Sequence, residues 1–195
     1  MRRICVFSGS NPGVREEYRQ AATALGRELA ARGLELVYGG ASVGLMGAVA
    51  SAALAAGRKT CGVLPRGLFR REVAHAGLTE LREVGSMHER KALMADLADG
   101  FIALPGGYGT FDELFEIVTW AQIGIHEKPI GLLNIAGYFD PLLALVAHAA
   151  REGFVPEQQA SLLMCETDPA ALLDRFAAYT PPAHTNKWSE LPPEP

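Results

Sequence analysis

The segment PGGYGTFDE, residues 105–113, follows the apolar run FIAL and precedes LFEIVTW. This order predicts that a strand ends, that three glycines form a turn, and that a helix begins directly afterwards. Glycines let the backbone approach a phosphate closely, and the free N–H groups of a helix start attract an anion. Thr110 and Glu113 also have the spacing of a capping box, which would only stabilise the helix start. The two interpretations are compatible, because a carboxylate at a helix start also lies beside whatever the loop binds.

The same alternation of short apolar runs and helical patterns extends along the chain. Strands are predicted at residues 3–8, 34–38, 59–65, 81–84, 100–105, 128–134 and 161–166, and helices at residues 14–32, 45–56, 87–99, 109–124, 137–152 and 168–179. Strand and helix alternate without hairpin signals, which indicates right-handed crossovers. We therefore predict an α/β fold with a single Rossmann-like, doubly wound, mostly parallel sheet and helices on both faces. This domain is expected to cover residues 1–179, and the proline-rich residues 180–195 are predicted to be a disordered tail.

Composition and charge argue against several classes of function. The chain of 195 residues has a formal net charge of −4, so a nucleic-acid partner is not expected. It has neither a long apolar segment nor a cleavage-site pattern near its start, so we expect a cytoplasmic protein without a membrane partner. Cys5, Cys61 and Cys165 lie far apart in apolar runs without zinc-site spacing, which predicts buried free thiols and no metal site.

Three glycine-containing loops follow predicted strands, at residues 8–13, 38–47 and 105–110. The carboxyl ends of parallel strands share one edge of a sheet, so we expect these loops to lie together and to bind a phosphorylated ligand. The dinucleotide fingerprint is absent, because GASVGLMG has the wrong spacing, and no P-loop is present. The sequence therefore favours a nucleotide or sugar phosphate that is bound without a cofactor.

The stretch SMHERKALM, residues 86–94, is a second candidate element. Arg90 and Lys91 lie in the first turns of a predicted helix, where cations oppose the helix dipole. In one interpretation they form a solvated charge cluster with Glu89. In the other, Arg90 reaches over a strand end and binds a phosphate or a ribose through its two-pronged guanidinium. The pattern alone leaves both open.

Taken together, PGGYGTFDE, the upstream MHERK and the downstream TWAQIGIHEKPIGLLN resemble the Lonely Guy family of cytokinin riboside 5′-monophosphate phosphoribohydrolases. CVFSGS, LVYGGASVGLMG, GVLP and GYFDPLL extend the resemblance over about residues 3–155. Ser8 stands where this family often has Cys, and Ala41 where it often has Gly. The resemblance implies hydrolysis of the N-glycosidic bond of a nucleoside 5′-monophosphate, either a cytokinin riboside 5′-monophosphate or AMP, to a free base and ribose 5-phosphate.

The resemblance also implies site residues and an assembly. Arg90 and Glu113 match the catalytic pair of the family. The substrate-binding positions that it implies are Ser8, Gly9, Gly40, Gly44, Met46, Glu72, Lys91, Gly106, Gly107, Tyr108, Gly109, Thr110, Phe111, Asp112 and Thr119. A homodimer is implied, with the Trp120-bearing helix near the subunit contact. The name lysine decarboxylase, which such sequences often carry, has no support here, because no lysine stands in an obvious Schiff-base setting.

The chemistry can be assigned to residues as a hypothesis. Cleavage through an oxocarbenium-like state needs negative charge near the anomeric carbon and an oriented water, and Glu113 could supply both. Arg90 would hold the ribose phosphate or orient Glu113, while no residue is identified as the acid for the leaving base. Two other classes stay open: a non-catalytic carrier of a nucleotide or molybdenum cofactor, and an oligomerising partner protein that depends on the apolar helix 114–123. Arg90 and Glu113 together favour the enzyme, since a carrier needs the glycines but not that carboxylate.

Overall fold

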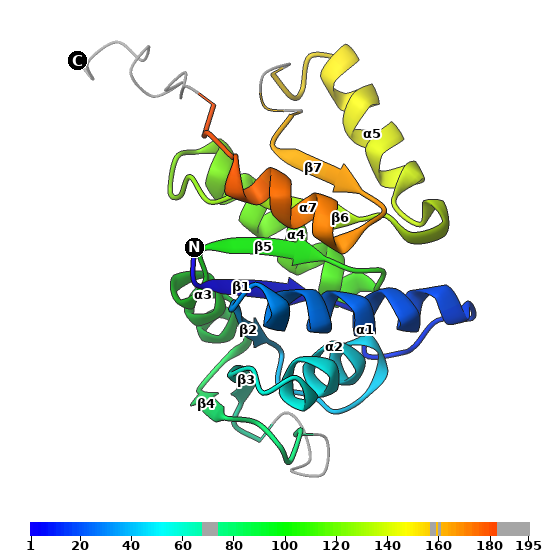
Figure 1. The fold of residues 1–195 in the computed structure, drawn as a ribbon. Coiled ribbons are helices and arrows are strands. Elements are labelled where there is room, and N and C mark those ends of the chain that lie inside the picture. Colours follow the sequence, from blue (N-terminus) through cyan, green and yellow to red (C-terminus); the bar gives the residue numbers. More distant parts are fainter. Residues whose placement is uncertain (68–73, 157–158, 160, 183–195) are drawn as a thin grey trace, which may run out of the picture.

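Seven parallel strands form the centre of the computed structural model, which describes residues 1–67, 74–156, 159 and 161–182 (Figure 1). The strands are β1 (Arg3–Phe7), β2 (Glu35–Tyr38), β3 (Thr60–Pro65), β4 (Glu80–Val84), β5 (Gly100–Ala103), β6 (Ile130–Leu133) and β7 (Leu163–Glu166). Their order in the sheet is β4-β3-β2-β1-β5-β6-β7, and every pairing is parallel. The predicted α/β fold with a Rossmann-like, doubly wound sheet is confirmed.

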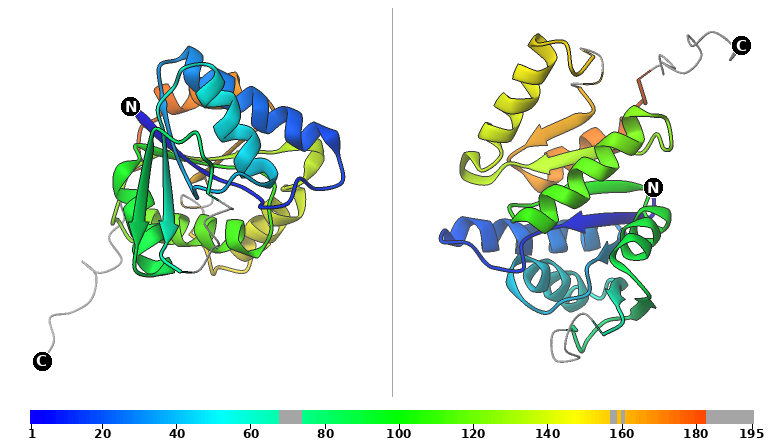
Figure 2. Two further views of the ribbon diagram at one scale, coloured as in Figure 1. Left: turned by 90° about the horizontal axis from the view of Figure 1, so that it is seen from below. Right: turned by 180° about the vertical axis from the view of Figure 1, so that it is seen from behind.

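Helices cover both faces of this sheet. On the face turned to the viewer in Figure 1 lie α1 (Glu16–Ala31), α2 (Gly44–Ala55) and α7 (Pro169–Ala177). On the opposite face, seen in the right-hand view of Figure 2, lie α3 (Met87–Leu97), α4 (Tyr108–Gln122) and α5 (Asp140–Arg151), the last after the short 3₁₀ turn η2 (Ile135–Gly137). Each face has its own apolar core, because the strands are buried on both sides and apolar side chains of the covering helices pack against them.

The helices α1 and α2 pack closely against each other because Gly26 lies at their contact. A Cβ at this position would come within 2.4 Å of the Val49 carbonyl oxygen and 2.8 Å of the Ala52 Cβ. The alanine-rich sequence of α2 likewise leaves room for a near neighbour. This close packing also places the two loops that precede α1 and α2 side by side, and the N–H of Leu45 donates to the Gly9 carbonyl at 3.0 Å.

The chain changes direction across the sheet between β1 and β5. From β1 it continues through α1 on one face, and from β5 it continues through α4 on the other face. The loop after β1 and the loop after β5 therefore lead to opposite faces of the sheet. They still meet at the strand ends, where the Gly9 N–H donates to the Pro105 carbonyl at 3.0 Å. Such a switch point is where open parallel sheets bind their ligands.

The predicted elements all occur in the described residues, with ends that differ from the predicted ones by a few positions. The predicted tail at 180–195 and the predicted binding residue Glu72 fall largely or wholly outside the described part of the chain. The extent of the domain therefore stays a prediction. No helix of the described residues combines the length and the apolar character that a membrane crossing requires.

We predict that Gly26→Val destabilises the protein by about 2–3 kcal/mol, because the added methyl groups must displace the backbone of α2. Equilibrium unfolding in urea measures the change. Ala24→Val, at an exposed position of the same helix, is the control and should cost about 0.6 kcal/mol, the helix-propensity difference. Equal stability of Gly26→Val and the wild type would show that the two helices are not held at this distance.

Candidate active site

The loops that follow β1 and β5 enclose a cleft of about 500 Å³ at the switch point. Residues 8–13 form one wall and residues 105–110 the other, and Leu45 and Met46 from the start of α2 complete the rim. The expectation that glycine-rich loops gather at one edge of the sheet is therefore met. Arg90 from α3 and Glu113 from α4 reach the same cleft from the opposite face of the sheet.

The structure brings together many of the residues that the sequence singled out, but not all of them. Those that line the cleft are Arg90, Glu113, Ser8, Gly9, Met46, Gly106, Gly107, Tyr108, Gly109 and Thr110. Those that lie outside its lining are Gly40, Gly44, Lys91, Phe111, Asp112 and Thr119. Glu72 is not among the described residues.

Arg90 and Glu113 form a buried ion pair. The Arg90 Nη1 donates to the Glu113 Oε1 at 2.9 Å, and the two side chains are 8% and 9% exposed. The Arg90 Nε donates to the Val63 carbonyl at 3.0 Å, which fixes the guanidinium against β3. The solvated charge cluster that the sequence left open is thus wrong for Arg90. Its guanidinium is held in a defined direction, as recognition of an anion or orientation of a carboxylate requires.

Burial decides the proton affinity of Glu113. Its pKa is raised to about 6, because the loss of hydration outweighs the opposing charge and hydrogen bond of Arg90. The carboxyl group is therefore mostly ionised at pH 7 but gains its proton within the physiological range. Carboxyl groups with such shifted pKa values are typical of acid–base sites.

The capping-box prediction for Thr110 and Glu113 is wrong. Helix α4 begins at Tyr108 with Gly107 as its N-cap, and no side chain caps it, so Glu113 stands too far inside the helix to reach back. Thr110 is buried next to Gly106, where any Cβ would lie 2.1 Å from the Thr110 Oγ1. The first amide N–H groups of α4 therefore remain available to an anion in the cleft.

Ser8 adds a further polar group to this end of the cleft. Its side chain is buried, 6% exposed, and its Oγ has no hydrogen-bond partner among the described residues. A buried hydroxyl without a partner is costly unless a ligand or water completes it. In contrast, the first amides of α2 are already used, because those of Leu45 and Met46 both point to the Gly9 carbonyl. Of the three loops that were expected to bind an anion, only those at residues 8–13 and 105–110 therefore remain as candidates.

Several predicted residues outside the cleft have contacts that explain their positions. Lys91 forms ion pairs with Asp112 at 3.0 Å and with Glu116 at 3.1 Å, which join α3 to α4 beside the catalytic candidates. Gly44 packs on the backbone of Ser10, since a Cβ there would lie 2.3 Å from the Ser10 carbonyl carbon.

The three remaining predicted residues outside the cleft, Gly40, Thr119 and Phe111, form contacts that stabilise the fold. The carbonyl of Gly40 accepts from the His75 N–H at 3.0 Å, and the Thr119 hydroxyl donates to the Phe115 carbonyl at 2.7 Å. Phe111 packs against the core under α3 and α4. A binding role for any of these positions stays a prediction.

Among the residues that sequence reasoning did not single out, Gly39, Tyr18 and Tyr138 have contacts that shape the site. Gly39 lies against Arg90, and a Cβ there would stand 2.1 Å from the Arg90 Nη2. The Tyr138 hydroxyl donates to the Gly106 carbonyl and so holds the glycine loop, while its ring meets Tyr18 edge-on at 5.8 Å. The doubled glycine after β2 and the position of Tyr138 shortly after β6 were the available signals, because both follow strand ends at this edge.

Comparison with known proteins agrees with this geometry. The family described as "Possible lysine decarboxylase" matches residues 46–176. A probable cytokinin riboside 5′-monophosphate phosphoribohydrolase of Oryza sativa subsp. japonica is 51% identical over 94% of this chain and 74% of its own. A cytokinin riboside 5′-monophosphate phosphoribohydrolase of Arabidopsis thaliana is 47% identical over 92% of this chain and 84% of its own.

Solved structures confirm the fold at lower identity. The molybdenum cofactor carrier protein of Chlamydomonas reinhardtii has a TM-score of 0.70 and 23% identity over 91% of this chain and 99% of its own. Identity at this level supports a common fold and carries no argument about the ligand. The identities near one half over nearly the whole chain, together with the family match, decide the relationship: the chain belongs to the family of the cytokinin riboside 5′-monophosphate phosphoribohydrolases.

Proposed function

We propose that the protein hydrolyses the N-glycosidic bond of a nucleoside 5′-monophosphate and releases the free base and ribose 5-phosphate. The observation that carries the proposal is the buried Arg90–Glu113 pair, which borders a cleft rich in glycine at the switch point of the sheet. The relatives that are about half identical to this chain are named for this reaction.

The phosphate is assigned to the end of the cleft between residues 8–13 and 105–110. Free amides at the start of α4 and the unpartnered Ser8 hydroxyl supply donors there, and the positive end of the helix dipole favours the dianion. Gly106 lets the loop pass close to Thr110, and the Tyr138 hydroxyl donates to the carbonyl of Gly106, which therefore already has a hydrogen-bond partner. The sugar then extends toward Arg90 and Glu113.

The ionised Glu113 performs two tasks at the anomeric carbon. Its charge stabilises the positive charge that develops on the ribose as the bond to the base lengthens, and its free oxygen accepts a proton from the attacking water. The bond from the base nitrogen to C1′ breaks, the water oxygen bonds to C1′, and a proton ends on the base. Arg90 keeps the carboxylate ionised and oriented, because its charge opposes the effect of burial on the Glu113 pKa.

A non-catalytic carrier is the weaker candidate. The molybdenum cofactor proteins that share this fold are only 21–23% identical to this chain. Their ligand therefore gives no information about the ligand of this chain. A carrier also needs the glycine loops that would bind its ligand, but it does not need a carboxylate at the border of the cleft.

Assembly and location belong to the proposal as well. A homodimer is proposed from the family resemblance, and Phe115 on α4, 41% exposed, is an apolar side chain at the helix that the resemblance places near the subunit contact. A cytoplasmic location is likewise proposed.

Hydrolysis is tested by incubation of the purified protein with an N⁶-prenylated AMP, AMP, GMP and CMP, followed by chromatography of the products. We expect free base and ribose 5-phosphate in equal amounts from at least one adenine nucleotide. The ratio of the prenylated substrate to AMP decides between a cytokinin-activating enzyme and an AMP nucleosidase. Tight binding of the nucleotides without any release of base would support a carrier instead.

We predict that Glu113→Gln lowers kcat by about 100-fold or more, the effect of one positioned acid–base or electrostatic group, with a smaller change in KM. Glu116→Gln, one turn further along α4 and outside the cleft, is the matched control and should keep most of the activity. Steady-state kinetics of both variants, with circular dichroism to verify folding, give the answer. A folded Glu113→Gln variant with unchanged kcat would contradict the catalytic role.

The pH dependence of kcat/KM should follow the protonation of Glu113 in the free protein. Because the ionised form is the active one and its pKa is about 6, kcat/KM should be constant above that pH and fall as the pH decreases through it. The phosphate of the substrate titrates in the same pH range. The variant Asp112→Asn distinguishes the titration of Glu113 from that of the phosphate. The charge of Asp112 raises the Glu113 pKa, so its removal should move the acid limb to lower pH. An acid limb that stays in place in this variant would assign the titration to another group.

A further inference from the structure

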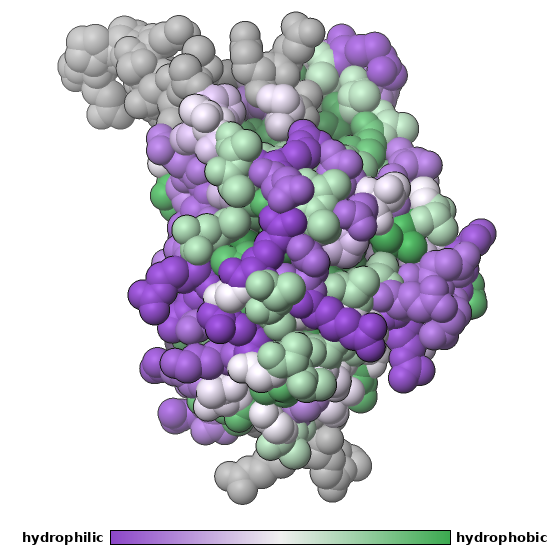
Figure 3. Space-filling model, viewed as in Figure 1, coloured by the Kyte–Doolittle hydropathy of each residue, from purple (hydrophilic) through white to green (hydrophobic). Residues whose placement is uncertain are grey.

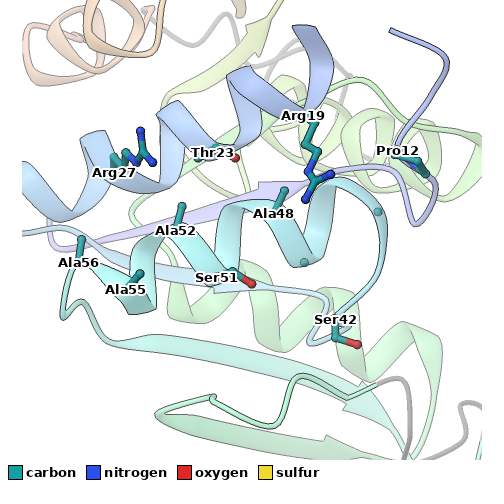
Figure 4. A pocket seen from close by; sticks show the side chains of 12 residues that line it. Pro12, Arg19, Thr23, Arg27, Ser42, Ala48, Ser51, Ala52, Ala55 and Ala56 are labelled. Atoms are coloured by element: carbon teal, nitrogen blue, oxygen red, sulfur yellow. The ribbon is translucent and has the colours of Figure 1, made fainter. Parts of the chain in front are cut away.

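A second hollow, of about 820 Å³, runs between α1 and α2 on the outer side of these helices (Figure 4). Arg19, Thr23 and Arg27 form its wall on α1, and their spacing of four residues places them on one face of that helix. Its floor consists of the small side chains of Ala48, Ala52 and Ala55 on α2 and of Ala56 directly after that helix. We call this hollow the α1–α2 groove.

The two arginines of the α1–α2 groove are not engaged by the protein. Both are exposed, and neither has an ion pair or a side-chain hydrogen bond with any residue that the structure describes. Arg32 on the same helix, in contrast, is paired with Glu28 and Asp174, both at 2.7 Å. The described lining of the groove contains no Asp or Glu, although the protein has a net charge of −4. The groove thus favours an anionic occupant.

The lining also limits the kind of anion. No aromatic side chain is among the described residues that line the groove, so a nucleobase would find no stacking surface there. Two arginines are too few for the footprint of a nucleic acid duplex. Figure 3 shows this face with hydrophilic and weakly hydrophobic residues mixed and the most hydrophobic ones in small separate spots, which is unlike a docking site for an apolar helix.

The distance between the arginines fits an extended chain. Eight residues separate Arg19 from Arg27, which corresponds to about 12 Å along a helix. In an extended peptide, side chains four residues apart point the same way and lie about 13 Å apart. We propose that the α1–α2 groove binds an extended acidic peptide segment of a partner protein. Two of its carboxylates, four residues apart, pair with Arg19 and Arg27, and small side chains between them rest on the alanine floor.

The test uses a fluorescein-labelled hexapeptide with aspartate at positions 1 and 5 and alanine elsewhere, titrated with the full-length protein at low ionic strength. Fluorescence anisotropy should show binding that weakens as salt is added. Arg19→Ala/Arg27→Ala should lose about tenfold in affinity, the effect of two exposed charge pairs. Arg15→Ala/Arg151→Ala removes the same charge from exposed positions outside the groove and should bind nearly as the wild type does.

Three results would overturn the proposal. They are equal binding of a peptide with asparagine in place of aspartate, an equal loss in both double variants, and no binding by the wild type. Inorganic tripolyphosphate serves as a competitor, and its binding through Arg19 and Arg27 in the absence of peptide binding would assign the groove to a small polyanion instead. None of these measurements uses hydrolase activity, so their outcome is independent of the proposed reaction.

Discussion

A single backbone hydrogen bond, from the Gly9 N–H to the Pro105 carbonyl, marks the constraint on which the site depends. It joins the ends of two neighbouring parallel strands whose following helices lie on opposite faces of the sheet. The strands must run parallel for their carboxyl ends to meet, and the loops must be nearly free of side chains for the backbones to approach. A Cβ on Gly9 would already lie 3.2 Å from the Gly106 Cα. The cleft is thus a consequence of topology and glycine placement together.

The buried ion pair beside this cleft shows two opposing electrostatic effects. Loss of hydration raises the pKa of Glu113, the charge of Arg90 lowers it, and burial is the larger effect. Because this pKa stays below neutral, the ionised carboxylate is the main form at pH 7. Arg90 itself is kept in place by the Val63 carbonyl and by the space over Gly39. The same pair therefore holds α3 against α4. It also supplies a carboxylate whose pKa lies close to neutral pH.

Much of the fold could be predicted from the sequence because most of its strands are short apolar runs that alternate with longer helical segments. The sequence also indicated that the glycine loops would share one edge, which follows from parallel strand order. Predictions of the site failed where the spacing of residues in the sequence was interpreted without the tertiary contacts around them. Thr110 and Glu113 have capping-box spacing, yet α4 begins earlier, and Glu113 turns to an arginine 23 positions away. The amides of Leu45 and Met46 in the first turn of α2, expected to attract an anion, instead donate to the Gly9 carbonyl.

The sequence by itself determined the element order, the parallel sheet, the positions of the glycine loops and the identity of the charged residues near them. These properties depend on side-chain type and on short-range periodicity, which a linear sequence carries in full. Only the tertiary structure decided which amides stay free, that Arg90 is buried against Glu113, and that Tyr138 and Gly39 belong to the site. Such properties depend on the distance and direction between elements that are far apart in the chain. The groove between α1 and α2 has the same origin, since Arg19 and Arg27 of α1 and the alanines of α2 line it only when the two helices pack together.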